Sequence, residues 1–125
     1  MKLIVNLMVV NMAQSMAEAL ALGSKAGLDW DAMLDMLMQS TIASPFIKAK
    51  SSLLKARDFS PTMTARLILK DIDLMLDAAH STEMELPLTS TTRSLVQALV
   101  NDGQAEDDYM ALVKLARQRA GLPPL

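Results

Sequence analysis

Apolar residues surround almost the whole circumference of the first predicted helix, Met1 to Gly27. A helix that is apolar on all sides is typical of the centre of a bundle and not of its surface. Two polar residues interrupt its opening turns. Lys2 and Asn6 lie four positions apart, so they project from the same face of the helix. This pair could contact one small polar ligand, which makes it the first candidate for chemistry.

Five further helices follow, each bounded by capping residues, proline or glycine. We expect them after the N-cap Asp29, from Ser44-Pro45 to about Arg57, from Pro61 to about His80, from Pro87 to Asp102-Gly103, and from about Glu106 to Ala120. The chain shows no alternating strand pattern and no internal repeat. The predicted fold is therefore all-α, a bundle of about six helices in a single domain, residues 1–125.

The apolar spacing within these helices predicts which side chains face the core. The fourth helix carries the longest such stripe: Ala65, Ile68, Ile72, Met75 and Ala79. The stripes of the second, fifth and sixth helices are Ala32, Met33, Met36 and Leu37; Leu88, Leu95, Leu99 and Val100; and Met110, Val113 and Ala116. The cations of the third helix, Lys48, Lys50, Lys55 and Arg57, are expected to form a solvated face.

Composition and the absence of known motifs exclude or disfavour several classes of function. The chain has no cysteine, which excludes disulfides, cysteine nucleophiles and cysteine-ligated zinc, and fits a cytoplasmic location. Twelve basic residues against fourteen acidic ones give a net charge of −2, so nothing favours nucleic acid as a partner. No glycine-rich phosphate loop, nucleophile elbow or histidine pair is present. The only histidine, His80, lies near a predicted helix end, where a capping or surface role is typical.

The opening stretch also has two targeting interpretations. A basic start, an apolar middle and small residues after it loosely match a secretory signal. The second interpretation is a transmembrane helix, which is disfavoured because no uncharged, predominantly apolar run of 18 residues is present. Polar residues at Asn6, Asn11, Gln14 and Glu18 recur through this stretch, and each would be costly in the core of a bilayer. The pattern therefore favours a buried helix of a bundle and no membrane association.

Five segments, taken in order, carry a resemblance to a known family. They are KLIVN at residues 2–6, AEALALGSKAGLD at 17–29, SPF at 44–46, LKDIDLMLDAA at 69–79 and ELPLTS at 85–90. In this order and spacing the chain resembles the C-terminal helical domain of the β-hydroxyacid dehydrogenases. These include 3-hydroxyisobutyrate dehydrogenase and the tartronate semialdehyde and glyoxylate/succinic semialdehyde reductases. The resemblance implies the fold of the 6-phosphogluconate dehydrogenase C-terminal domain.

The same resemblance implies an oxidoreductase that uses NAD or NADP, without a metal, to interconvert a 3-hydroxyacid and its short-chain semialdehyde. Lys2 matches the family's catalytic lysine, and Asn6 matches a substrate-binding residue one turn later. Lys70 matches the lysine that reaches the cofactor, and Asp71 matches the acid beside it. Family members also form homo-oligomers through this helical domain, and their small carboxylate substrates bind at its edge.

The chain departs from the family's pattern in two ways. Met63 stands eight residues before Asp71, where the glyoxylate and succinic semialdehyde reductases often have an aromatic residue. No dinucleotide fingerprint is present, so we expect the family's N-terminal Rossmann domain to be absent and the isolated chain to be inactive. The alternative function is a stand-alone helical association protein that has lost its nucleotide-binding domain. Without the resemblance, Lys2 is an ordinary chain-end lysine, Asn6 a satisfied polar residue of the bundle, and Lys70-Asp71 a surface charge pair.

Overall fold

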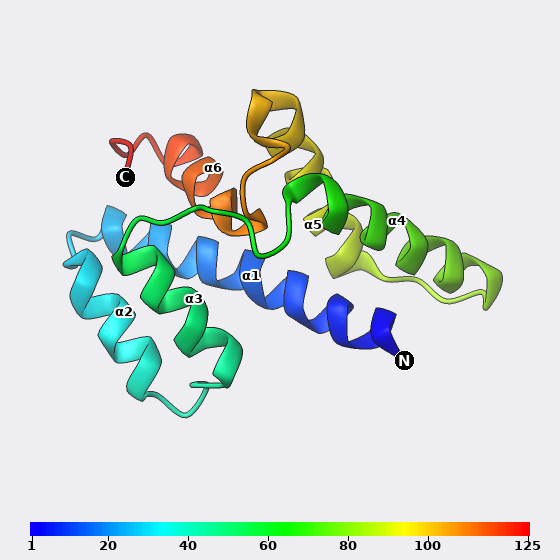
Figure 1. The fold of residues 1–125 in the computed structure, drawn as a ribbon, viewed down its shortest axis with the longest axis horizontal. Coiled ribbons are helices and arrows are strands. Elements are labelled where there is room, and N and C mark those ends of the chain that lie inside the picture. Colours follow the sequence, from blue (N-terminus) through cyan, green and yellow to red (C-terminus); the bar gives the residue numbers. More distant parts are fainter.

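The helix α1, Lys2–Lys25, runs through the length of the molecule; α2, α4, α5 and α6 pack against it, and α3 packs against α2 (Figure 1). The computed structural model describes all residues, 1–125. Around α1 lie α2 (Trp30–Gln39), α3 (Pro45–Lys55), α4 (Ala65–Ser81), α5 (Pro87–Leu99) and α6 (Leu112–Arg119). A π-helical turn, η1 (Val100–Gln104), extends α5, and a 3₁₀ turn, η2 (Tyr109–Ala111), leads into α6. The predicted all-α bundle of six helices is confirmed.

The central position predicted for α1 holds for most of its length. From Val10 onward the helix buries one apolar side chain per turn or more: Val10, Ala13, Met16, Ala17 and Leu20 are all at most 3% exposed. Its first two turns differ, because Ile4, Val5 and Met8 are more than half exposed. The prediction of a helix buried on all sides is therefore wrong at this end, and also at Leu22, which is 73% exposed. In the first two turns, Leu3, Ile4 and Leu7 face residues of α4 and of the loop that follows α4.

By length and composition alone, α1 could cross a membrane. Its apolar residues from Val10 to Leu20 instead pack against α4, α5 and α6 within one core. Gly27 follows the C-cap residue Ala26, and its φ of +84° suits glycine. The Gly27 and Leu28 amides donate to the carbonyls of Ser24 and Gly23, which closes the helix in a Schellman motif as its sequence predicts.

The predicted caps of α2 and α3 are confirmed. The Asp29 carboxylate accepts the Ala32 amide at 2.8 Å, and the Ser44 hydroxyl accepts the Ile47 amide at 3.2 Å. The predicted start of α4 at Pro61 is wrong. The helix begins at Ala65, and the Thr64 hydroxyl caps it by accepting the Leu67 amide. Residues 59–64, which precede α4, pair with the segment before η2. The Asp108 amide donates to the Phe59 carbonyl, and Thr64 and Asp108 form an isolated antiparallel β-bridge.

The predicted core stripe of α4 is confirmed, because all five of its residues are buried. In α2, by contrast, Met36 is exposed, and Trp30 and Leu34 occupy the core in its place. In α5, Leu88 is exposed and Thr89 and Thr92 are buried, since both threonines are hydrogen-bonded to Asn11 of α1. The sixth helix begins later than predicted, because Asp108 caps η2 by accepting the Met110 amide.

Candidate functional site

Two of the four predicted site residues meet where the exposed end of α1 crosses α4. The Asn6 amide nitrogen donates to the Asp71 carboxylate at 2.7 Å, across 65 positions of sequence. Both side chains are half-buried. An ionised carboxylate only accepts, so Nδ2 of Asn6 must face it, and this fixes which way the Asn6 amide points. Asn6 keeps one N–H and its carbonyl oxygen for another partner.

Lys2 occupies the first turn of α1, one turn before Asn6 on the same face. The side chain is exposed, and no hydrogen bond or ion pair within the molecule holds its ammonium. A lysine at a helix N-terminus also gains nothing from the helix dipole. Its ammonium is therefore available to a ligand that contacts the open face of the Asn6–Asp71 pair.

Lys70 is exposed on α4 and has no partner in the molecule. Adjacent helical residues point about 100° apart. Because Asp71 points to Asn6, Lys70 points away from that contact. The structure thus joins Asp71 to the predicted substrate-binding residue, Asn6, and leaves Lys70 separate. No local pattern in the sequence signals this Asn6–Asp71 contact, since the two residues lie on different helices.

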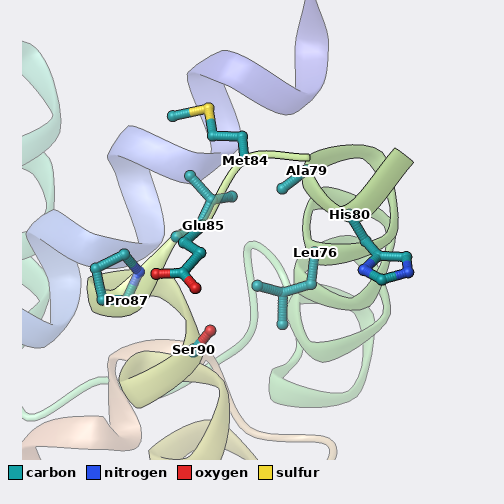
Figure 2. Close-up of a pocket in the computed structure, with 8 residues that line it drawn as sticks. Leu76, Ala79, His80, Met84, Glu85, Pro87 and Ser90 are labelled. Carbon is teal, nitrogen blue, oxygen red and sulfur yellow. The ribbon is translucent and has the colours of Figure 1, made fainter. Parts of the chain in front are cut away.

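Two cavities flank this end of the bundle. One, of about 360 Å³, is lined by apolar residues of α1 and α4, including Leu3, Leu7 and Met75. The other, of about 320 Å³, lies between the end of α4 and the start of α5 and contains Glu85 and Ser90 (Figure 2). His80 is exposed in the last turn of α4, and Leu76 lies between its ring and the Glu85 carboxylate in Figure 2. The predicted surface position of His80 is confirmed.

A buried polar cluster, which the sequence analysis missed, lies away from this junction. The Lys50 ammonium donates to both carboxylate oxygens of Asp108 at 3.0 Å, and it lies 4.6 Å from the centre of the Tyr109 ring. Thr62 donates to the same carboxylate through its amide and its hydroxyl. Lys50 is 5% exposed, so the predicted solvated face of α3 is wrong at this residue. We call Lys50, Thr62, Asp108 and the Met110 amide the Asp108 cluster.

Burial alone would raise the pKa of Asp108. Hydrogen bonds from the Met110 amide, the Lys50 ammonium and both donors of Thr62 outweigh burial and hold that pKa below its ordinary value. Burial, with the Asp108 charge beside it, also raises the pKa of the Tyr109 phenol. Every oxygen of Asp108 is occupied by these donors, so the cluster has no acceptor left for a ligand. We therefore regard it as structural.

No three side chains of the histidine, cysteine, aspartate or glutamate types lie close enough together to hold a metal ion. The exposed ammonium groups of Lys2 and Lys70 are the predicted site residues that could contact a dinucleotide or a substrate. These can contact phosphate or carbonyl oxygens but cannot enclose a pyrophosphate.

Known proteins resemble this chain over most of its length. Residues 1–116 match the family model described as "NAD-binding of NADP-dependent 3-hydroxyisobutyrate dehydrogenase". The L-threonate dehydrogenase of Haemophilus influenzae is 31% identical over 99 residues, which are 79% of this chain and 33% of that protein. Glyoxylate/succinic semialdehyde reductase 1 of Arabidopsis thaliana is 25% identical over 117 residues, which are 94% of this chain and 40% of that protein.

Solved structures agree with this match. The crystal structure of 3-hydroxyisobutyrate dehydrogenase from Salmonella typhimurium superposes with a TM-score of 0.85 and 27% identity, over 91% of this chain and 40% of that one. The chain thus spans a third to two fifths of the length of these relatives. The family predicted from the five sequence segments is confirmed. The chain belongs to the 3-hydroxyisobutyrate dehydrogenase family and corresponds to its C-terminal, all-helical NAD-binding domain.

Proposed function

We propose that residues 1–125 are the helical substrate and dimerisation domain of an NAD(P)-dependent oxidoreductase that interconverts a 3-hydroxyacid and its short-chain semialdehyde. The family match supports this reaction class. The single observation that carries the proposal is the Asn6–Asp71 hydrogen bond, with Lys2 one turn before Asn6. Three of the four residues assigned from the resemblance, Lys2, Asn6 and Asp71, therefore lie at one exposed junction.

In this proposal the Lys2 ammonium donates a proton to the substrate oxygen during reduction and stabilises the negative charge that develops there. An ammonium aimed at a developing alkoxide supplies both effects. The free N–H and carbonyl oxygen of Asn6 hydrogen-bond the hydroxyl or carboxylate of the substrate. Asp71 keeps the Asn6 amide in the required orientation. The substrate then lies between α1 and the bound cofactor.

The dinucleotide supplies the hydride when it is bound. Lys70 fits a role beside it, because its ammonium is exposed and has no intramolecular partner. Residue 63 is a methionine, half-buried against the core, where the glyoxylate and succinic semialdehyde reductases often have an aromatic residue. We therefore propose the substrate only as a short 3-hydroxyacid or its semialdehyde, in a cytoplasmic enzyme.

The decisive experiment assays the complete product of the reading frame that encodes these residues. We expect it to oxidise NADPH or NADH with a short semialdehyde, and Lys2→Ala to lower kcat roughly 10² to 10⁴-fold. The matched control is Lys48→Ala, which removes another exposed lysine, on α3, and should leave kcat unchanged. Equal activity of Lys2→Ala and the wild type would overturn the catalytic role of Lys2.

Two further outcomes bear on this proposal. The 125 residues alone should not oxidise NADPH, because they contain no glycine-rich loop for the pyrophosphate. If the complete product turned over no semialdehyde or hydroxyacid with either cofactor, the stand-alone association protein would replace the enzyme as the best account.

We also propose self-association through exposed apolar residues. Leu22, Leu28 and Met36 line an apolar cavity of about 560 Å³ between α1 and α2. Exposed apolar patches of this kind mark association surfaces. Light scattering should show a dimer or larger species, and a monomer at high micromolar concentration would contradict this.

A further inference from the structure

Arg117 is a buried cation without an anionic partner. It is 9% exposed, and none of the five ion pairs in the molecule includes it. Its guanidinium donates from Nε and Nη2 to the Pro123 carbonyl and from Nη1 to the Ser24 hydroxyl, at 2.9 to 3.2 Å. These acceptors are neutral. A buried charge is costly unless an opposite charge lies beside it, so an anion bound beside Arg117 would lower this cost.

The surroundings of Arg117 add positive charge. The guanidinium carbons of Arg117 and Arg57 lie 5.4 Å and 5.9 Å from the centre of the Trp30 ring. Burial and the nearby Arg57 charge together lower the pKa of Arg117. The face of an indole ring attracts a cation, but it does not neutralise two. Trp30 therefore has two positive charges beside its ring.

Arg117 also lines a cavity of about 630 Å³ together with Gln104, Lys114 and Gln118, and Leu122, Pro124 and Leu125 form the rest of its wall. A guanidinium has five N–H donors, and three are used within the molecule, which leaves two. The Lys114 ammonium donates one N–H to Asp107 and lies 4.0 Å from the centre of the Phe59 ring, and its other two N–H groups make no hydrogen bond within the molecule. The side chains of Gln104 and Gln118 make no hydrogen bond within the molecule. Two cations and two free amides facing one cavity form a set of donors that suits a small oxyanion.

We propose that this cavity binds a small oxyanion of the carboxylate or phosphate class. The site lies at the end of α1 that carries Ser24, about 27 Å along the helix from Asn6, so it is separate from the α1–α4 junction. The net charge of −2 disfavours a polyanion such as nucleic acid, and the size of the cavity suits a small ligand.

The test uses Trp30, the only tryptophan of the chain, as a reporter beneath Arg117. The fluorescence of the full chain is titrated with inorganic phosphate and with acetate, each against sodium chloride at equal ionic strength. We expect a saturable change with at least one oxyanion and none with chloride. Saturation by phosphate alone assigns the ligand to the phosphate class, and saturation by acetate alone assigns it to the carboxylate class.

Three variants locate the site. Lys114→Gln should weaken the Kd about tenfold, the loss expected for one charge-assisted hydrogen bond. Gln118→Glu places a carboxylate in the cavity and should abolish binding. Arg119→Gln removes one positive charge from α6, as Lys114→Gln does, but Arg119 lies outside this cavity. The Kd of this variant should therefore equal that of the wild type. Circular dichroism checks that each variant is folded.

The proposal is overturned if neither oxyanion produces a saturable change, or if chloride reproduces it. It is also overturned if folded Lys114→Gln and Arg119→Gln bind with the same affinity, because a general screening of charge would then explain the signal. None of these outcomes depends on oxidoreductase activity.

Discussion

Two carboxylates each join segments far apart in the chain, and they do so in opposite ways. Asp108 is 2% exposed and accepts hydrogen bonds from Lys50, Thr62 and Met110. Asp71 is half-buried and accepts a single hydrogen bond, from Asn6. The first leaves no polar group free, whereas the second leaves Asn6 with a donor and an acceptor exposed. This difference separates a group that holds the fold together from a group that is arranged to meet a ligand.

The physical reason is the cost of burial. Taking an ammonium and a carboxylate out of water is favourable only when other hydrogen bonds complete the coordination of both. The Asp108 cluster meets this condition and thereby fixes the segment before α4 against the segment before η2. The Asn6–Asp71 contact involves one neutral side chain and water-accessible groups, so the fold depends on it much less.

The largest expected effect is the loss of the buried carboxylate. Asp108→Asn should lower the free energy of unfolding by about 3–5 kcal/mol, because Lys50 then remains buried without its counter-charge. The neighbouring residue supplies the control. Asp107 pairs with Lys114 at a partly exposed position, so Asp107→Asn should cost less than about 1 kcal/mol. Urea denaturation measures both, and equal losses would contradict a structural role for the Asp108 cluster.

The pH dependence of stability sharpens the same comparison. The pKa of Asp108 is lowered in the folded chain, so its stabilisation is complete above the pKa of an unfolded aspartate, about 3.9. It is lost as the pH falls through the lower pKa of the folded state. The stability difference between wild type and Asp108→Asn should therefore be constant near neutral pH and shrink below about pH 4. A difference that does not change with pH would show that the folded and unfolded pKa values are equal.

Sequence patterns predicted the elements well wherever the cause was local. The caps at Asp29 and Ser44 and the stripe of α4 all depend on neighbouring residues, and all are confirmed. The failures have causes distant in the sequence. The start of α4 moved to Ala65 because Asp108, over 40 positions later, binds the residues before it. The sequence pattern predicts a solvated Lys50 because its partner, Asp108, also lies far away in the chain.

The candidate site shows the same limit. Periodicity placed Lys2 and Asn6 on one face of a helix, and the family resemblance supplied roles for them and for Lys70 and Asp71. Neither source predicted that Asp71 would contact Asn6, because that contact depends on how α1 crosses α4. The sequence likewise does not predict that Arg117 lacks an anionic partner, because the groups around its guanidinium come from distant parts of the chain.

Removing the charge of Asp71 should separate function from stability. Asp71→Asn should cost at most about 1.5 kcal/mol of unfolding free energy, because a half-buried hydrogen bond is weakened and not left buried and unmade. In the complete oxidoreductase we expect kcat/KM to fall about tenfold, since the Asn6 amide loses its fixed orientation. The control is Asp77→Asn, an exposed aspartate on the same helix. A large loss of stability with unchanged kcat/KM would place Asp71 with Asp108 as a structural residue.

The smallest expected effect concerns an exposed contact that is as short as the Asn6–Asp71 hydrogen bond. Arg66, in the first turn of α4, binds Glu106 at 2.7 Å, but their side chains are 64% and 73% exposed. Water and salt screen such a pair, so a double-mutant cycle with Arg66→Gln and Glu106→Gln should give a coupling below about 0.5 kcal/mol. High salt should reduce it further. This pair joins α4 to the same loop as Asp108, so a coupling close to that of the Asp108 cluster would mean that contact length, and not burial, determines which polar contacts hold this fold.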